Sequence, residues 1–64
     1  MNRIKEIRES KHLMQKELAE IAKISRPYLH DLEYNRRGAR PETYKRIADA
    51  LGVTVEELID RKAG

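Results

Sequence analysis

Side chains that can bind nucleic acid gather between residues 25 and 40 of this 64-residue chain. The stretch SRPYLHDLEYNRRGAR carries hydrogen-bonding side chains on a short helical pattern and three arginines directly after it. Arginine can bind guanine O6 and N7 in a fork, and it can also neutralise backbone phosphates. The pattern therefore predicts contacts with a polyanion.

The helical pattern after Ser25 supplies candidates for reading base edges. A helix turns by about 100° per residue. If Leu29 and Leu32 point inward, the side chains between residues 26 and 31 other than Leu29 therefore point outward or to the flanks. The candidates for base reading are Arg26, Pro27, Tyr28, His30 and Asp31.

Each candidate has an expected role and an alternative. Arg26 is expected to bind guanine or a phosphate, and the ring of Pro27 could touch a thymine methyl group. Asp31 could accept only from cytosine N4, or it could hold Arg26 or Arg36 in place. His30 is a better base or phosphate donor than a metal ligand, because no second ligand lies nearby. For Tyr28 and His30, DNA contact and ordinary surface exposure stay open.

A second group of residues is suited to phosphate contact. Arg36, Arg37 and Arg40 follow the helical pattern where a DNA strand would pass, although a charge run can also serve solubility. Gln15 and Ser25 stand at the starts of two helical patterns, where free N–H groups and a partial positive charge attract anions. The candidates for phosphate contact are Gln15, Ser25, Arg36, Arg37 and Arg40.

The charge distribution agrees with a polyanionic partner. Residues 1–46 hold 12 Lys/Arg against 7 Asp/Glu, a net +5, whereas residues 47–64 hold 2 against 4, a net −2. Without cysteine, disulfides and thiolate metal sites are excluded. We expect no metal, no cofactor and no catalytic centre, because neither a nucleophile–base pair nor a glycine-rich phosphate loop is present. No apolar run approaches the roughly 18 residues of a membrane span, and no signal-peptide pattern opens the chain, so a cytoplasmic protein is expected.

Apolar residues recur at helical spacing and predict five helices in one all-α domain over residues 1–64. The first should run from about Asn2 to Lys11, and the second should start near Gln15 with Leu18, Ile21 and Ala22 as its apolar positions. The third should follow Ser25 as N-cap, and the fourth should run from Pro41 to Gly52. A Thr54–Glu57 capping box should begin the fifth.

The second and third predicted helices are joined by only three residues. Small Ala19 lets the helices approach closely, and Ile24 fills the corner between them. Such a pair crosses at a steep angle and leaves the second helix protruding, in the form that fits the DNA major groove.

These residues resemble the helix-turn-helix of the phage-repressor (Cro/cI, or XRE) family, from about Ile4 to Ile59. The resemblance lies in QKELA at residues 15–19, ISR at 24–26, LHDLE at 29–33 and IADALGV at 47–53. Two positions depart from the family. Lys23 replaces a frequent turn glycine, at a cost on the order of 1 kcal/mol, and Asn35 stands where a glycine often ends the recognition helix.

The resemblance implies a five-helix, lambda-repressor-like DNA-binding fold. It also implies that Gln15 binds a phosphate and that Arg8 and Glu33 form a structural ion pair. The implied function is a transcriptional regulator, expected to be a repressor, that binds double-stranded DNA at a near-palindromic operator as a homodimer. The dimer-interface candidates, some of which must instead close the core, are Val53, Val55, Leu58 and Ile59.

One alternative function stays open. Antitoxins and immunity-type regulators use the same fold mainly to hold a protein partner. In either case, the residues could form one domain of a longer chain.

Overall fold

The computed structural model describes residues 2–59 and contains five α-helices in this range. The helices are α1 (Ile4–Ser10), α2 (Gln15–Ala22), α3 (Arg26–Glu33), α4 (Pro41–Leu51) and α5 (Val55–Leu58). The described residues form no strand beyond an isolated antiparallel bridge between Asn2 and Ile59. The all-α, five-helix prediction is confirmed, although α1 is shorter at both ends than expected.

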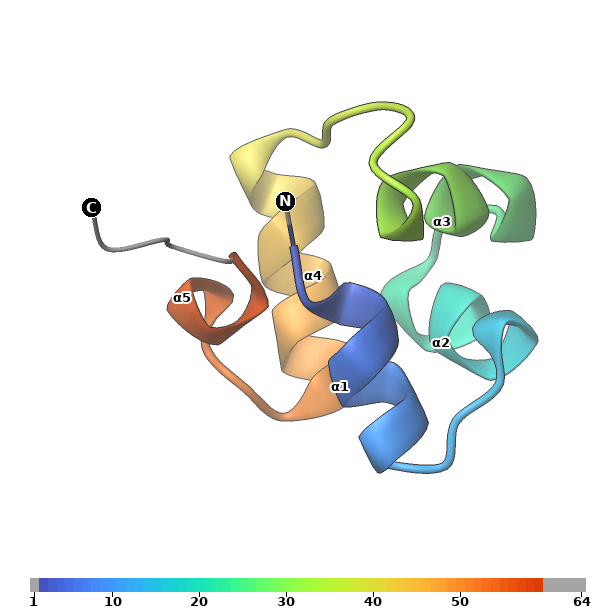
Figure 1. Ribbon diagram of the computed structural model, residues 1–64, viewed down its shortest axis with the longest axis vertical. Coiled ribbons are helices and arrows are strands. Elements are labelled where there is room, and N and C mark those ends of the chain that lie inside the picture. The colour runs from blue at the N-terminus through green and yellow to red at the C-terminus, as the bar shows by residue number, and fades with distance from the viewer. Residues whose placement is uncertain (1, 60–64) are drawn as a thin grey trace.

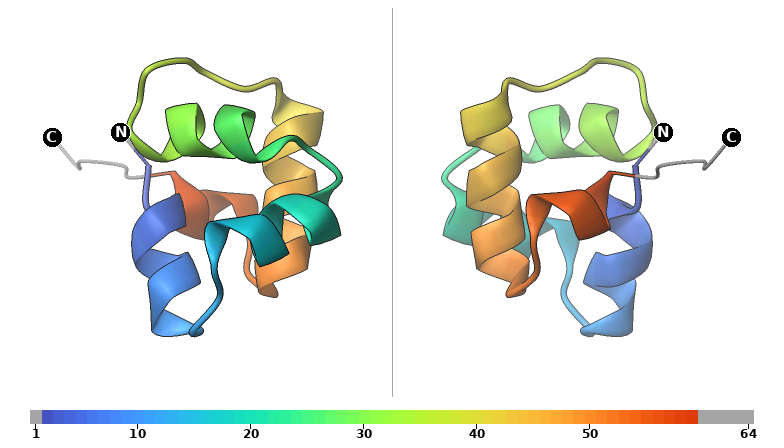
Figure 2. Two further views of the ribbon diagram at one scale, coloured as in Figure 1. Left: turned by 90° about the vertical axis from the view of Figure 1, so that its right-hand side faces the viewer. Right: turned by 90° about the vertical axis from the view of Figure 1, so that its left-hand side faces the viewer.

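α4 is the longest helix and lies behind α1, with α5 on one side of it and α2 and α3 on the other (Figure 1). α2 packs against both α3 and α4, while α1 contacts α3 and α4, and α5 closes against α4. Seen from the side, α3 lies beyond α2 at one end of the molecule, and the segment 34–40 passes from α3 across to α4 (Figure 2). The arrangement leaves α3 with one face on the core and the other toward solvent.

One apolar core joins all five helices. Its largest fully buried side chains come from every helix: Ile4, Leu18, Leu29, Leu32, Ile47 and Leu58. Ala19 and Ala22 are buried where α2 meets its neighbours, and Ile24 packs partly buried in the turn, as the sequence predicts. Tyr44 also packs partly buried against this core. Because Leu29 and Leu32 occupy the core, the opposite side of α3 must face outward.

The caps predicted at the starts of α3 and α5 and at the end of α4 agree with the structure. Ser25 Oγ accepts a hydrogen bond from the Tyr28 N–H at 3.2 Å, which caps α3. Thr54 and Glu57 form a reciprocal capping box at α5, with bonds of 3.2 and 2.8 Å. Gly52 ends α4 in the left-handed conformation, at φ 72°.

Three residues with side chains also adopt left-handed backbone conformations. Lys23 ends α2 at φ 60° and Asn35 follows α3 at φ 59°, at the two positions where the sequence departs from the family pattern. His12 has φ 60° as well, which the sequence did not indicate. Lys23 keeps the turn at a cost of about 1 kcal/mol relative to glycine.

Ile21 is one of the apolar positions that predict the second helix, and its side chain is 55% exposed. Leu58 was a candidate for the dimer interface, but it is fully buried in the core of the single chain and cannot form that surface. Val53 and Val55 pack partly buried against the core, and Ile59 is 37% exposed.

Asn2 ties the start of the chain to the end of α3. Its side-chain oxygen accepts from the Ile4 N–H at 3.0 Å, and its amide donates to the Leu32 carbonyl at 2.8 Å. The amide also contacts Asn35 Oδ1 at 3.1 Å. These bonds satisfy polar groups at both helix ends and fix α3 against α1. Between residues 2 and 59, no helix is long and apolar enough to cross a membrane.

Candidate nucleic-acid interface

A buried ion pair anchors α3 to the rest of the molecule. Arg8 Nε donates to Glu33 Oε2 at 2.6 Å, and Arg8 Nη2 donates to Glu33 Oε1 at 3.2 Å. Arg8 Nη1 also donates to the Leu13 carbonyl at 2.7 Å. Both residues are buried, at 8% and 6% exposed. The forked geometry fixes the end of α3 on α1 and has the form that the family resemblance implies.

Gln15 joins this ion pair from the start of α2. Its Nε2 donates to Glu33 Oε1 at 2.9 Å and lies 3.4 Å from His30 Nδ1. The sequence did not predict these contacts, because His30 and Glu33 follow Gln15 by 15 and by 18 positions along the chain. Gln15 therefore links the buried ion pair to a residue on the outward side of α3.

The outward side of α3 forms a shallow hollow with the start of α2. Arg26 and Pro27 are exposed, whereas Tyr28, His30 and Asp31 are partly buried. The hollow has a volume of about 350 Å³ and is lined by Gln15, Arg26, Pro27, His30 and Asp31. The structure thus brings four of the five base-reading candidates and one phosphate candidate to a single surface.

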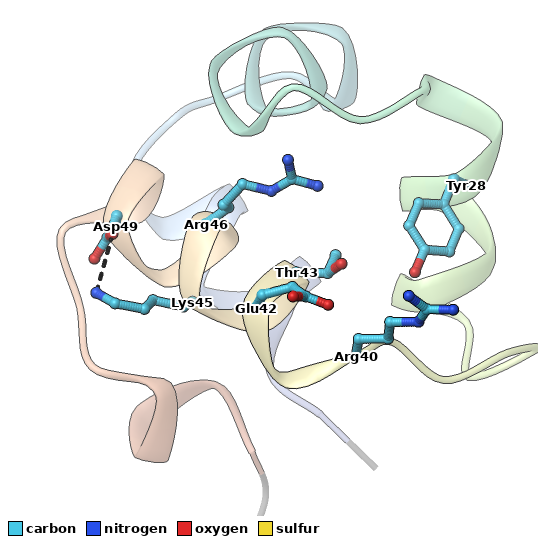
Figure 3. Close-up of a pocket in the computed structure, with 7 residues that line it drawn as sticks. All are labelled: Tyr28, Arg40, Glu42, Thr43, Lys45, Arg46 and Asp49. Atoms are coloured by element: carbon cyan, nitrogen blue, oxygen red, sulfur yellow. Dashed lines mark ion pairs between the residues drawn. The ribbon is translucent and has the colours of Figure 1, made fainter.

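Tyr28 lies on a different flank, beside a larger hollow between α3 and α4 (Figure 3). The hollow has a volume of about 770 Å³ and is lined by Tyr28, Arg40, Glu42, Thr43, Lys45, Arg46 and Asp49. Lys45 is paired with Asp49 at 3.5 Å, while Arg40 and Arg46 extend into the space between the helices. The sequence did not indicate a role for Arg46, because its position on the second turn of α4 becomes relevant only once Tyr28 of α3 is placed across the same hollow.

The three candidate arginines after α3 are exposed. The Arg37 guanidinium lies 5.0 Å from the centroid of the Tyr28 ring, which gives this arginine a preferred position. Arg40 is the N-cap of α4, and Gly38 in the segment between α3 and α4 has open space where a Cβ would lie. Arg37 and Arg40 therefore lie on the flank of α3 that carries Tyr28.

Lys5 and Tyr34 form another contact that the sequence did not predict. Lys5 Nζ donates to the Tyr34 hydroxyl at 3.1 Å and lies 4.9 Å from its ring centroid. The hydrogen bond to Tyr34 raises the pKa of Lys5 above its ordinary value of 10.5. Tyr34 in turn stacks at a tilt on His30, with ring centroids 4.6 Å apart. The contact extends the polar surface of α3 toward α1.

The Asp31 carboxylate holds neither Arg26 nor Arg36 in an ion pair. Within residues 2–59 the ion pairs join other residues, and none connects Asp31 with Arg26 or Arg36. The Asp31 main-chain carbonyl instead accepts from the Arg36 N–H at 2.8 Å. Over the same described range, no group of three or more His, Cys, Asp or Glu side chains could hold a metal ion.

A helix-turn-helix family model matches residues 4–58, nearly the whole described chain. The chain belongs to this family, in its XRE (Cro/cI) type, which consists of DNA-binding transcription regulators. The family predicted from the motifs at residues 15–33 and 47–53 is thereby confirmed.

Two curated proteins show the relationship in sequence. The chain is 40% identical over 58 residues to the HTH-type transcriptional regulator DdrOP3 of Deinococcus deserti, covering 91% of this chain and 45% of the relative. It is 42% identical over 57 residues to the immunity repressor protein of Bacillus phage phi105, covering 89% of this chain and 40% of the relative. The chain therefore spans less than half the length of these relatives.

Solved structures show the same fold. The N-terminal DNA-binding domain of SinR from Bacillus subtilis matches with a TM-score of 0.84 and 32% identity, covering 97% of this chain and 91% of that domain. A solution structure of the SinR domain matches with a TM-score of 0.78 at the same identity and coverage. These matches confirm the lambda-repressor-like helix-turn-helix architecture.

Proposed function

We propose that this chain is a sequence-specific transcriptional repressor that inserts α3 into the major groove of double-stranded DNA. The observation that carries the proposal is the gathering of Arg26, Pro27, His30 and Asp31 with Gln15 around one exposed hollow. These side chains offer donors, acceptors and an apolar ring, which are the groups that distinguish base edges. The family and the name of the SinR domain support DNA as the ligand.

Phosphate contacts would flank this face on two sides. The N-terminus of α2 offers free N–H groups beside Gln15, and Arg36, Arg37 and Arg40 lie along the other flank. The Ser25 hydroxyl oxygen caps α3 by accepting from the Tyr28 N–H. The hydroxyl hydrogen is the group of Ser25 that we propose to donate to a phosphate. In this arrangement, bases are read at the centre and the strands are held at the sides.

We also propose that the protein binds its operator as a homodimer. Two α3 helices would then enter successive major grooves, roughly 34 Å apart, on a near-palindromic site. Val53, Val55 and Ile59 lie near the C-terminal end of the described chain, and their exposed parts are the proposed contact surface. Leu58 supports this surface from the core.

Selection of bound duplexes from a random DNA pool tests the proposal. The expected result is an enriched sequence with two inverted half-sites separated by about one helical turn. Enrichment of no sequence would contradict specific recognition, and a single unrepeated half-site would contradict the homodimer.

Salt dependence separates this function from a role in holding a protein partner. For DNA binding, the logarithm of the affinity should fall against the logarithm of salt concentration with a slope of about −0.9 per contacted phosphate. A protein-binding regulator would instead form a stoichiometric complex that persists in high salt.

A further inference from the structure

The His30 ring is held from two sides. The Tyr34 ring lies on one side, with centroids 4.6 Å apart and planes inclined by 41°. The Gln15 amide nitrogen lies on the other, 3.4 Å from His30 Nδ1. Tyr34 itself is held by Lys5, which donates to its hydroxyl. The imidazole therefore keeps its Nδ1 edge toward α2.

Glu33 determines which end of the Gln15 amide faces His30. A carboxylate paired with a guanidinium accepts hydrogen bonds and has no proton to donate. The Gln15 atom at 2.9 Å from Glu33 Oε1 must therefore be the amide nitrogen. That nitrogen carries two hydrogens, so it can donate to Glu33 and to His30 at once.

The state of the His30 ring follows from this orientation. A nitrogen that can only donate needs an acceptor opposite it, so Nδ1 of the neutral ring must be unprotonated and Nε2 must carry the hydrogen. We propose that Gln15 is a positioning residue that fixes His30 as the Nε2–H tautomer, and that His30 donates this hydrogen to N7 of a purine. The inference rests on the proposed function, because it assigns His30 a contact within that DNA interface.

The proposed contact has a defined selectivity. Adenine and guanine both present N7 as an acceptor in the major groove, whereas cytosine presents a donor. A single N–H cannot form the two-bond fork by which arginine selects guanine. His30 should therefore accept either purine at one position and reject cytosine. Thymine O4 is also an acceptor, so the experiment must remove N7 itself rather than exchange the base pair.

The first test needs no DNA. Long-range ¹H–¹⁵N NMR of the free protein at about pH 8.5, where imidazole is neutral, reports the tautomer of each histidine. His30 should be the Nε2–H form alone, whereas exposed His12 should show a mixture and serves as the internal control. Gln15→Leu should give His30 a mixture like that of His12. A wild-type His30 in the Nδ1–H form, or as mixed as His12, would overturn the proposal.

The second test uses the duplex obtained by selection from the random pool, with each purine replaced in turn by its 7-deaza analogue. One replacement should weaken wild-type binding by about 2- to 12-fold, the contribution of a single hydrogen bond, and leave the binding of His30→Leu unchanged. His12→Leu, the matched control, should keep the full wild-type sensitivity.

The outcomes separate this inference from the function on which it rests. If selection enriches no sequence, the proposed function fails and this contact fails with it. If a sequence is enriched but His30→Leu alters sensitivity at no 7-deaza position, only the His30 contact is overturned. Both readouts on the wild-type chain are independent of whether Gln15→Leu folds.

Discussion

Arg26 is the side chain on which base selectivity should depend most. It begins α3, is exposed, and lines the hollow formed with Gln15 and His30. Its guanidinium can form the two-bond fork with guanine that a histidine cannot. Arg26→Ala should therefore weaken operator binding by about 1–3 kcal/mol and relax the preference at one base pair. Titration of the selected duplex and of a random duplex measures both effects. An equal loss on the two duplexes would assign Arg26 to a phosphate instead.

Arg37 should act through charge alone. It lies on the flank of α3 and rests over the Tyr28 ring. Arg37→Ala should weaken specific and random duplexes alike and reduce the salt slope by about one. Tyr28→Leu removes the ring that positions Arg37 without removing the charge, so it should lower affinity while leaving the slope nearly unchanged. A wild-type slope in Arg37→Ala would remove this arginine from the interface.

The attachment of α3 depends on the buried contact between Arg8 and Glu33. Glu33→Gln keeps the shape of the side chain but removes the buried counter-charge of Arg8, whose other carboxylate contact is with exposed Glu9 at 3.9 Å. The expected loss in the free energy of unfolding is roughly 3–5 kcal/mol, because desolvation of Arg8 is then largely uncompensated. Urea denaturation of the free protein provides the measurement.

The exposed pair Arg3–Glu6 offers a matched control. Its atoms are 3.3 Å apart and its side chains are 45% and 68% exposed. Glu6→Gln should change the free energy of unfolding by less than about 1 kcal/mol, because water already screens this pair. Equal effects of Glu33→Gln and Glu6→Gln would mean that the buried pair does not hold α3.

The turn between α2 and α3 holds a residue in a conformation that glycine adopts more easily. Lys23 has φ 60° and ψ 45°. Lys23→Gly should therefore stabilise the fold by up to about 1 kcal/mol. Glu20→Gly, within the same helix, should destabilise it by roughly that amount, because glycine raises the entropy of the unfolded chain. Thermal unfolding of both variants checks the opposite signs, and a destabilised Lys23→Gly would show that Lys23 makes compensating interactions.

Local signals in the sequence predicted most of the helix ends. Ser25 and the Thr54–Glu57 pair act on backbone groups within three residues of themselves, so their roles could be derived from spacing alone. The Arg8–Glu33 pair spans 25 positions and was expected only through the family resemblance. Ile21 lies at the edge of the apolar stripe of α2, where the position of α4 decides which side chains are covered.

The polar contacts of the site were harder to predict. Gln15 was expected to face a phosphate, and its contacts with Glu33 and His30 depend on the crossing angle of α2 and α3. Composition and spacing carry no information about that angle at the level of single atoms. The same reason explains why the sequence predicted neither the contact between Lys5 and Tyr34 nor the position of Arg46 beside the Tyr28 hollow.

The distribution of charge over the folded chain favours one side for DNA. Arg26, Arg36, Arg37 and Arg40 all lie on α3 or on the segment that follows it, away from the acidic first turn of α5. Val53, Val55 and Ile59 lie on or beside α5, and their exposed parts are the proposed surface for a second copy. Val55→Lys should weaken the dimer and therefore weaken operator binding. Sedimentation of the free chain in the analytical ultracentrifuge should show a larger fraction of monomer than for the wild type. An unchanged monomer fraction would exclude Val55 from the interface.

The insertion of α3 into DNA is tested most directly by titrating the ¹⁵N-labelled chain with its selected duplex and following the amide resonances. The largest changes should map to the start of α2, to α3 and to residues 36–40, while α5 and the exposed side of α1 stay near their free positions. If the largest changes instead surround Ile21 or map to α1 and α5, with α3 unaffected, α3 is not the element that enters the groove.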